Sequence, residues 1–255
     1  MNRRQHYKER EEIEMTKGIV LSLYDFTGEA LKPWAEAGYE CYAFDIQHPV
    51  EGRTEGGIHY RRADLHNKDN LLALPSEFSD KPVVFGMAFP VCTDMAVSGA
   101  AHFKRKAERD PEFQVKAVNY AKWCAWLFDA LGVPYFVENP VSVLATKWRK
   151  PDHSFHPYEY GGYIPDNQAE HPRWPEYIAP KDAYKKKTCL WTGGGFVMPT
   201  KVSVDPEKYH GNGYSTAMMK LGGKSQRTKD IRSATPRGFA KAVYEFNSQS
   251  AEEMA

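Results

Sequence analysis

The sequence predicts an α/β protein with a Rossmann-like fold, in which helices cover both faces of a mostly parallel sheet. Two observations carry this prediction. Short apolar runs typical of buried strands alternate with segments of helical character over residues 18–140. Several runs end in a carboxylate or in a turn with glycine or proline, where open α/β sheets bind their ligands. The chain of 255 residues is long enough to form one large domain with a complete core.

Composition narrows the class of protein. Apolar residues make up 42% of the chain and charged residues 26%, which is typical of a globular protein in water. The formal net charge of +1 neither supports nor excludes a nucleic-acid partner. The four cysteines include no Cys-x-x-Cys pair, so we expect neither a disulfide framework nor a structural zinc site. Because no apolar run reaches the roughly 20 residues that span a bilayer and no signal peptide is evident, we expect a cytoplasmic protein without a membrane partner.

The first predicted strand lies within residues 18–29 and breaks into a turn at Gly28. Residues 30–37 have helical character, and Gly38 closes this helix. A single glycine in the turn, instead of Gly-x-Gly-x-x-Gly, argues against a nicotinamide-dependent dehydrogenase.

The apolar runs 39–44 and 58–63 end in Asp45 and Asp64, respectively. In Rossmann-like folds, an acidic residue at the end of the second strand binds the hydroxyls of an adenosine ribose. Asp45 fits that place, although an aspartate that starts a turn has the same signature. Asp64 equally fits the cap of a following helix.

A lone cysteine, Cys92, follows the apolar run 83–89 in a polar loop. A thiol just beyond the carboxyl end of such a strand, near a helix N-terminus, has a lowered pKa and is a candidate nucleophile. The alternative is a small buried apolar residue. A helix over residues 112–131 and a strand over residues 133–140 continue the alternating pattern.

The second half of the chain is less regular. Residues 148–184 are rich in proline and aromatic residues, and the pair His153 and His156 lacks a third ligand at a recognisable spacing. We therefore expect a surface loop and no metal site. A basic cluster then leads into a strand over residues 185–191, and residues 235–243 form a helix with threonine and proline at its start.

In this order the motifs resemble those of the cytosine-C5 methyltransferases, over residues 18–145 and 185–247. Residues 20–25 resemble the family's opening strand, Pro90-Val91-Cys92 resembles its Pro-Cys motif, and Glu138-Asn139-Pro140 resembles its Glu-Asn-Val motif. Residues 187–191 faintly resemble its strand of alternating basic residues. Residues 232–237 resemble its Arg-x-x-Thr-Pro-Arg motif. The resemblance implies a Rossmann-like methyltransferase fold.

Five segments are expected along the chain. They are a charged extension (1–16), a cofactor-binding and catalytic core (17–147), an irregular region (148–184), the C-terminal part of the catalytic domain with a reduced recognition region (185–247) and a tail (248–255).

The resemblance also implies the chemistry: S-adenosylmethionine is the methyl donor and cytosine in duplex DNA is the substrate, as in bacterial and phage DNA modification. Cys92 would be the nucleophile at C6, Glu138 would contact N3, and Asn139 would orient this turn. Lys187 is expected near O2 of the base, with Arg237 as the second choice. The residues expected to hold the cofactor are Tyr24, Asp25, Phe26, Thr27, Gly28, Asp45, Ile46, Asp64, Leu65 and Pro90.

Basic residues gather in the second half of the chain, which predicts phosphate contacts at the mouth of the cleft. A solvated charged face would have the same composition. In a duplex the base is stacked, so it must be flipped out before C6 can be reached. We expect basic side chains to hold the phosphates of the duplex while this happens. The residues expected to bind nucleic acid are Lys185, Lys186, Lys224, Arg227 and Arg232.

The chain also departs from the family. Phe26 and Glu29 replace usual glycines, Val91 separates the proline from the cysteine, and Pro140 replaces the usual valine. Only about 40 residues lie between positions 191 and 232, where the family carries a target-recognition domain. Sequence recognition would then be limited or supplied by a partner protein.

Two alternative functions remain open at the level of sequence. The same chemistry could act on RNA cytosine or on a free cytosine nucleotide. A catalytically silent relative that only binds DNA or a partner is disfavoured, because it has no physical reason to retain Cys92 and Glu138. A methyltransferase for adenine N6 or cytosine N4 is disfavoured, because residues 89–92 are Phe-Pro-Val-Cys where those enzymes need an Asp/Asn-Pro-Pro-Tyr/Trp loop.

Overall fold

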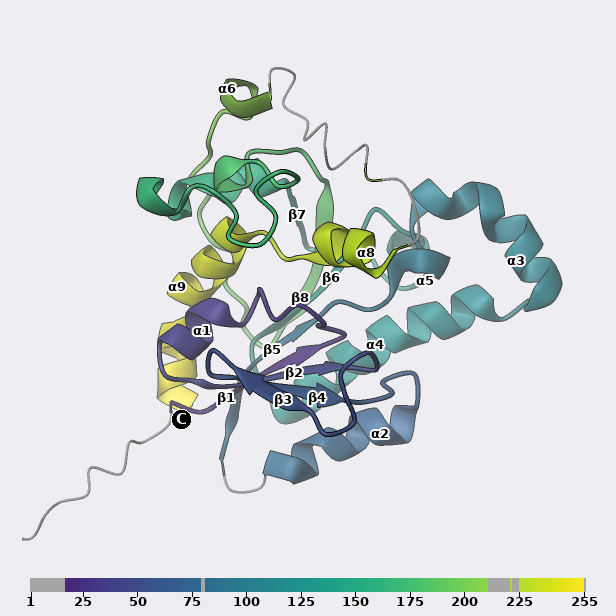
Figure 1. Ribbon diagram of the computed structural model, residues 1–255. Helices are drawn as coiled ribbons and strands as arrows, with labels where there is room; N and C mark the ends of the chain where they lie inside the picture. Colours follow the sequence, from purple (N-terminus) through teal and green to yellow (C-terminus); the bar gives the residue numbers. More distant parts are fainter. Residues whose placement is uncertain (1–16, 79–80, 211–220, 222–224, 255) are drawn as a thin grey trace, which may run out of the picture.

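A computed structural model describes residues 17–78, 81–210, 221 and 225–254. Its centre is one eight-stranded sheet with the order β3-β4-β2-β1-β5-β6-β8-β7 (Figure 1). The strands are β1 (Ile19–Leu23), β2 (Glu40–Asp45), β3 (Arg53–Glu55), β4 (Ile58–Arg62), β5 (Val83–Ala88), β6 (Tyr135–Pro140), β7 (His153–Phe155) and β8 (Thr188–Gly193).

The central strands β4, β2, β1, β5 and β6 are parallel. Three pairs are antiparallel: β3 with β4, β6 with β8, and β8 with β7. From β1 the chain builds the sheet outward through β2 and β4, and then returns to build the other side through β5 and β6. The order therefore reverses between β1 and β5, and such a switch point opens a crevice at the carboxyl ends of these strands.

Helices cover both faces of the sheet, as the alternating pattern predicts. Helices α1 and α9 pack together on one face, whereas α2 and α4 pack on the other. On the first face Trp34 stacks on Phe85 at 4.8 Å, and on the second Phe128 contacts Tyr135 at 5.4 Å between ring centroids. The helices are α1 (Lys32–Glu36), α2 (Lys68–Ala73), α3 (Phe103–Arg109), α4 (Phe113–Leu131), α5 (Leu144–Lys147), α6 (Glu207–His210), α8 (Gln226–Ser233) and α9 (Arg237–Met254).

Residues 148–184 are irregular, as predicted, but they are not a simple surface loop. Tyr160 is completely buried and contacts Phe155 at 5.4 Å and Phe239 at 5.3 Å between ring centroids. Trp174 is 6% exposed and belongs to a separate small core beneath α8. The expectation of a surface loop is wrong because buried aromatic side chains anchor this segment even where its backbone forms short 3-10 turns.

Helix α4 confirms the helix predicted over residues 112–131, and it ends at Gly132 with φ of 69°. Helix α9 begins where predicted and continues to Met254, so most of the expected tail is helical. Strands β3 and β7 were not expected from the sequence. The charged extension, residues 1–16, lies outside the described residues.

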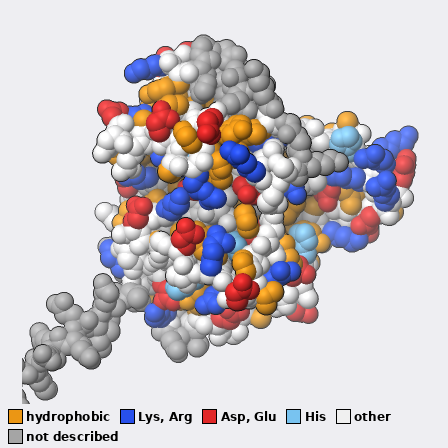
Figure 2. All heavy atoms as spheres, viewed as in Figure 1, with side chains coloured by type: hydrophobic (Ala, Val, Ile, Leu, Met, Phe, Trp, Pro, Cys, Tyr) orange, Lys and Arg blue, Asp and Glu red, His pale blue; other side chains and the backbone are white. Residues whose placement is uncertain are grey.

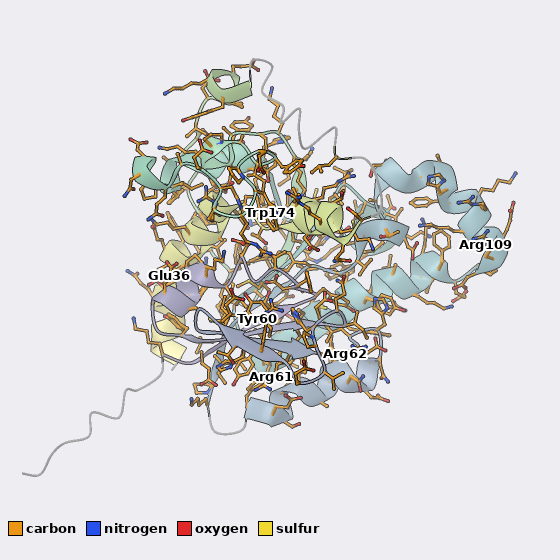
Figure 3. All side chains as sticks on the ribbon, in the orientation of Figure 1. Glu36, Tyr60, Arg61, Arg62, Arg109 and Trp174 are labelled. Atoms are coloured by element: carbon orange, nitrogen blue, oxygen red, sulfur yellow. The ribbon has the colours of Figure 1, made fainter. Side chains whose placement is uncertain are left out.

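Helix α3, the 3-10 segment η3 (Val97–His102) before it and the first turn of α4 project from the body of the molecule (Figure 1). We call this feature, residues 97–116, the α3 arm. The rings of Phe103 and Phe113 pack at 5.8 Å between centroids and hold its two helices together. Lys and Arg side chains gather toward the end of the arm (Figure 2), and Arg109 lies at its tip (Figure 3).

Candidate functional site

Cys92 lies in the loop after β5, at the switch-point edge of the sheet. It opens a single 3-10 turn, and its carbonyl oxygen accepts hydrogen bonds from the N–H groups of Met95 (2.9 Å) and Ala96 (2.8 Å). The Cys92 side chain is half-buried, whereas the other three cysteines are buried. All four positions are among the described residues, and Cys92 is thus the accessible thiol of the chain.

Asn139 fastens this loop to β6. Its Nδ2 donates a hydrogen bond to the carbonyl oxygen of Pro90 at 2.9 Å, and the residue is 1% exposed. Strands β5 and β6 are parallel neighbours, so their carboxyl ends lie side by side. The bond therefore fixes the Cys92 loop relative to Glu138, which precedes Asn139 in β6, and gives Asn139 the orienting position expected of it.

Glu138 faces a small cavity at the same edge. Its volume is about 10 Å³, which is room for about one water molecule. Burial raises the pKa of the Glu138 carboxyl above its ordinary range, and the charge of Lys186 partly opposes this rise. The cavity is lined by Phe89, Glu138, Phe155, Lys186, Thr188, Ser233, Ala234, Thr235, Pro236 and Phe239.

Four residues form one electrostatic group at this edge. The expectation of a lowered pKa for Cys92 is wrong: burial raises the pKa of the thiol, and the nearby Glu138 carboxylate raises it further. Lys186 and Arg232 act in the opposite direction and lower this pKa. The Nζ of Lys186 donates a hydrogen bond to the carbonyl oxygen of Arg232 at 2.8 Å, which holds the lysine in place. Ionisation of Cys92 is thus opposed by Glu138 and assisted by two cations.

Lys186, and not Lys187, faces Glu138. Side chains alternate along an extended chain, and Lys186 and Thr188 both line the cavity of Glu138. Lys187 is exposed and acts electrostatically on Cys189 instead. The lysine that lines this cavity is therefore not Lys187, the one predicted to lie near O2 of the base, but the residue before it. Because side chains alternate along this segment, Lys186 lies on the same side as Thr188 and Lys187 lies on the opposite side. The sequence could have distinguished the two lysines only if one residue that faces the cavity had been known.

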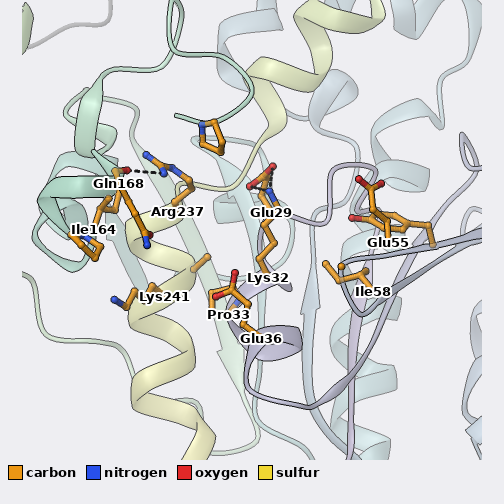
Figure 4. A pocket seen from close by; sticks show the side chains of 15 residues that line it. Glu29, Lys32, Pro33, Glu36, Glu55, Ile58, Ile164, Gln168, Arg237 and Lys241 are labelled. Atoms are coloured by element: carbon orange, nitrogen blue, oxygen red, sulfur yellow. Dashed lines mark hydrogen bonds and ion pairs between the residues drawn. The ribbon is translucent and has the colours of Figure 1, made fainter. Parts of the chain in front are cut away.

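Arg237 lies at a different cavity. A cavity of about 470 Å³ lies between α1, the β3–β4 turn and the start of α9 (Figure 4). Arg237 lines it together with Glu29, and its guanidinium donates to the carbonyl oxygens of Gln168 (3.0 Å) and Ala169 (2.9 Å). Arg237, the second choice for the contact with O2 of the base, is therefore not among the residues that line the Glu138 cavity, although residues 233–236 just before it are.

The predicted nucleic-acid contacts separate in the structure. Lys186 and Arg232 lie close enough to Cys92 to lower its pKa. Lys185 is exposed beside them. The guanidinium of Arg227 lies over the ring of Tyr177, 5.5 Å from its centroid, on the small core beneath α8. Lys224 lies outside the described residues.

The turn after β1 is built around Asp25. This residue is 4% exposed, and its carboxylate accepts hydrogen bonds from the Ser22 hydroxyl (2.7 Å) and from the N–H groups of Thr27 (3.1 Å) and Gly28 (2.7 Å). Tyr24 and Gly28 have φ of 58° and 68°, a left-handed conformation that glycine adopts without strain. Asp25 therefore shapes the turn, in which Thr27 and Gly28 are buried and Tyr24 and Phe26 are half-buried.

The loop after β2 combines a buried carboxylate with an exposed apolar side chain. Asp45 is 7% exposed and accepts hydrogen bonds from the backbone and side-chain nitrogens of Gln47 (2.8 and 3.1 Å). Ile46 beside it is 47% exposed. His48 was not predicted: its buried ring stacks on Phe26 at 5.4 Å between centroids, and its Nε2 donates to the carbonyl oxygen in the β1 turn at 3.1 Å. The loops after β1 and β2 are thus braced together.

The loop after β4 presents a carboxylate. Asp64 is exposed and accepts a hydrogen bond from the N–H of His66 at 3.1 Å. Asn67, and not Asp64, caps α2, which removes the alternative role for Asp64. Leu65 is buried, and its carbonyl oxygen accepts a hydrogen bond from the Tyr24 hydroxyl at 2.8 Å. This bond ties the loop after β4 to the end of β1.

The described part of the chain holds no group of three or more His, Cys, Asp or Glu side chains placed to bind a metal ion. The His171 ring accepts hydrogen bonds at Nδ1 from the N–H groups of Arg173 and Trp174, both at 3.2 Å. No helix in this part of the chain combines the length and apolarity needed to cross a membrane.

Comparison with protein-family models finds no matching family, and comparison with curated proteins finds no match. The chemistry of the site is nevertheless defined by its side chains. A partly accessible thiol, a carboxyl group with a raised pKa and two cations meet at one edge of the sheet. Such a set can form a covalent bond to an electrophilic carbon while a proton moves to a nearby nitrogen or oxygen.

Proposed function

We propose that this protein is an S-adenosylmethionine-dependent methyltransferase that methylates C5 of cytosine in DNA through a covalent bond between Cys92 and C6. The observation that supports this proposal is the proximity of Cys92, Glu138 and Lys186 at the switch-point edge. Addition to a pyrimidine ring needs a nucleophile at C6 and a proton donor at N3, and these residues can supply both. The ordered motifs that resemble the cytosine-C5 methyltransferases support the same proposal.

The carboxyl ends of β1, β2 and β4 fit the cofactor. The β1 turn carries Gly28 at φ of 68°, the β2 loop carries Asp45 beside the exposed Ile46, and the β4 loop carries Asp64. A carboxylate suits ribose hydroxyls, an exposed aliphatic side chain suits the face of a purine, and a second carboxylate suits its amino group. When bound, S-adenosylmethionine supplies the methyl group for C5.

In the proposed reaction the Cys92 thiolate adds to C6, and the S–C6 bond displaces the C5–C6 π electrons into the ring. Glu138 donates its proton to N3, so negative charge does not accumulate there. C5 becomes an enamine carbon that would take the methyl group as the bond between that group and the donor's sulfonium sulfur breaks, which would leave a neutral thioether. A water molecule would then accept the C5 proton. The electrons of the C5–H bond would restore the double bond, the S–C6 bond would break to release the thiolate, and Glu138 would recover the N3 proton.

The electrostatics favour this division of protons. An ionised Glu138 raises the pKa of Cys92, whereas a protonated Glu138 does not. The raised pKa of Glu138 favours the protonated carboxyl, and protonation removes one of the two causes that raise the pKa of the thiol. Lys186 and Arg232 assist, because both lower the pKa of the thiol.

A cytosine in a duplex must leave the stack to reach this site, at a cost of a few kcal/mol. The Glu138 cavity, at about 10 Å³, is too small for a pyrimidine ring. Part of its wall is residues 233–236, which link α8 to α9. Binding of the base thus requires these residues to move away from β6.

The test is covalent trapping with 5-fluorocytosine, whose fluorine cannot leave as the C5 proton does. The protein and S-adenosylmethionine are incubated with duplex DNA that contains the analogue, and in parallel with the corresponding RNA and with the free nucleotide. We expect a denaturation-resistant adduct with the duplex that disappears in Cys92→Ser and persists in Cys189→Ser. An adduct with RNA or nucleotide alone would replace DNA as the substrate, and no adduct at all would overturn the covalent mechanism.

A further inference from the structure

We propose that the α3 arm binds the phosphate backbone of the DNA whose cytosine reaches Cys92; this inference rests on the proposed function. The arm follows the Cys92 loop directly in the chain and projects from the body of the molecule (Figure 1). Its outer end carries a gathering of basic side chains (Figure 2). None of the basic residues expected from the sequence to bind nucleic acid belongs to this arm.

Lys104, Arg105 and Arg109 are exposed cations of the arm, and none of them forms an ion pair with a described residue. The other two, Lys106 and Lys116, each form an ion pair with an aspartate, at 2.6 and 2.7 Å. Among the residues that the structure describes, no carboxylate forms an ion pair with the three exposed cations. Their charge is thus available to an external anion.

Helical geometry places these cations in an extended row. Arg105 and Arg109 are four residues apart, so they share one face of α3 and lie about 6 Å apart along its axis. Lys104 borders this face. Phosphates along a nucleic-acid strand are regularly repeated anions, and a row of separate cations matches them better than it matches a single small anion.

Lys106 docks the arm on the catalytic loop. Its Nζ donates hydrogen bonds to the carbonyl oxygen of Thr93 (2.8 Å) and to the carboxylate of Asp94 (2.6 Å). Thr93 and Asp94 directly follow Cys92 in the same 3-10 turn. A polymer held by the arm is therefore held at a defined position relative to the thiol.

Three exposed valines lie around the Cys92 turn and the start of the arm, together with the exposed Thr93 and Ser98. Val91, Val97 and Val141 are 47%, 52% and 46% exposed, and the N–H of Val97 donates to the carbonyl oxygen of Val141 at 3.0 Å. Exposed apolar groups gathered at a site mark a surface that meets a partner. In a duplex the bases and sugars are flanked by phosphates. The valines beside the thiol would meet the bases and sugars, and the cations farther out on the arm would meet the phosphates.

The experiment measures the affinity for a duplex of random sequence as a function of salt. The variant Lys104→Gln/Arg105→Gln/Arg109→Gln is compared with Lys68→Gln/Lys208→Gln/Lys241→Gln, which removes the same charge from α2, α6 and α9. Each phosphate contact contributes about 0.9 to the slope of log K against log salt. We expect the slope of the arm variant to be smaller by about 2.7, with weaker binding at every salt concentration, and the slope of the control variant to equal that of the wild type.

Trapping with the 5-fluorocytosine duplex at saturating concentration separates this inference from the proposed function. Equal slopes in the wild type and the arm variant would overturn the inference even if both proteins form the adduct, as would a wild type that binds no DNA. A reduced slope in the arm variant supports the inference whether or not the adduct forms. Absence of the adduct in the wild type counts against the proposed function alone.

Discussion

Glu138 and Lys186 set the reactivity of Cys92 in opposite directions. The carboxylate raises the pKa of the thiol and the ammonium lowers it. Both side chains lie at the same edge of the sheet as Cys92, so replacement of either one changes the pKa of the thiol. The effect of each charge on the pKa of Cys92 can therefore be measured in a separate variant.

Replacement of Glu138 with Gln removes the negative charge that raises the pKa of Cys92, so that pKa falls. Alkylation of Cys92 by iodoacetamide then becomes faster at a given pH below the pKa, by about tenfold for each unit that the pKa falls. The measurement is the alkylation rate from pH 6 to 10, with Cys92→Ser as the control for the buried cysteines. Methyl transfer falls in the same variant, because N3 loses its proton donor. A rate profile that moves to higher pH would contradict the assigned proximity.

The neighbours Lys186 and Lys187 provide a matched pair. In Lys186→Gln the pKa of Cys92 rises, so the pH profile of adduct formation moves to higher pH and the rate at pH 7 falls by about tenfold per unit of that rise. Lys187→Gln has the same chemistry on the opposite side of the segment and leaves the profile in place. Single-turnover trapping over a pH series distinguishes the two. Equal effects of both variants would mean that strand alternation does not determine which lysine acts on the thiol.

At the scale of elements, the site depends on how the ends of β5 and β6 are joined. Strand pairing brings the two ends together, but the loop that carries Cys92 has its own conformation. Asn139 connects that loop to β6 through one buried hydrogen bond to the carbonyl oxygen of Pro90. Asn139 is thus the side chain that connects the nucleophile's loop to β6, while Lys106 holds the same turn from the α3 arm.

Asn139→Ala removes this connection. We expect a loss of about 1–3 kcal/mol in the free energy of unfolding and a fall of about 100-fold in the rate of adduct formation, since small displacements of reacting groups are costly. The matched control is Asn247→Ala, which removes a buried asparagine that joins α9 to Val197 far from the thiol. Urea denaturation should show a comparable loss of stability, while adduct formation by the control stays at the wild-type rate. A slow control would indicate that stability, and not positioning, limits the reaction.

At the scale of the whole molecule, the switch point divides the carboxyl edge into two parts. The ends of β1, β2 and β4 form the part proposed for the cofactor, and the ends of β5 and β6 with the start of β8 form the part proposed for the reaction. The loops of the first part are joined by hydrogen bonds from Tyr24 and His48. A ligand that bridges these loops would stabilise the entire fold.

S-adenosylmethionine at about 100 times its Kd should raise the stability by about 2.7 kcal/mol, which corresponds to an increase in Tm of roughly 5–10 °C for a chain of this size. Ile46→Ala removes the exposed apolar side chain beside Asp45 and should reduce this increase. Val50→Ala, in the same loop and 81% exposed, should leave it unchanged. Thermal unfolding with and without the cofactor checks both variants. The absence of any increase in the wild type would count against this cofactor site.

The central strands and the two main site residues could be predicted from the sequence, whereas the short edge strands could not. Central parallel strands are covered on both faces, so β1 and β5 read as apolar runs in the sequence. The positions of Cys92 and Glu138 near the ends of such runs were enough to predict that they share one edge of the sheet. Short edge strands such as β3 have no buried face, and all three of its residues are exposed, so no apolar pattern marks them.

What the sequence determined by itself was the α/β class, the order of the central elements and the two side chains at the reacting edge, because local apolar patterns encode buried strands directly. Only the tertiary structure decided that Lys186 faces Glu138, that Arg237 is fastened at another cavity, that residues 148–184 are packed, and that α3 projects with unpaired cations. Each of these depends on strand register or on contacts between segments distant in the chain. Such contacts have no local pattern, and they are settled only when the elements pack together.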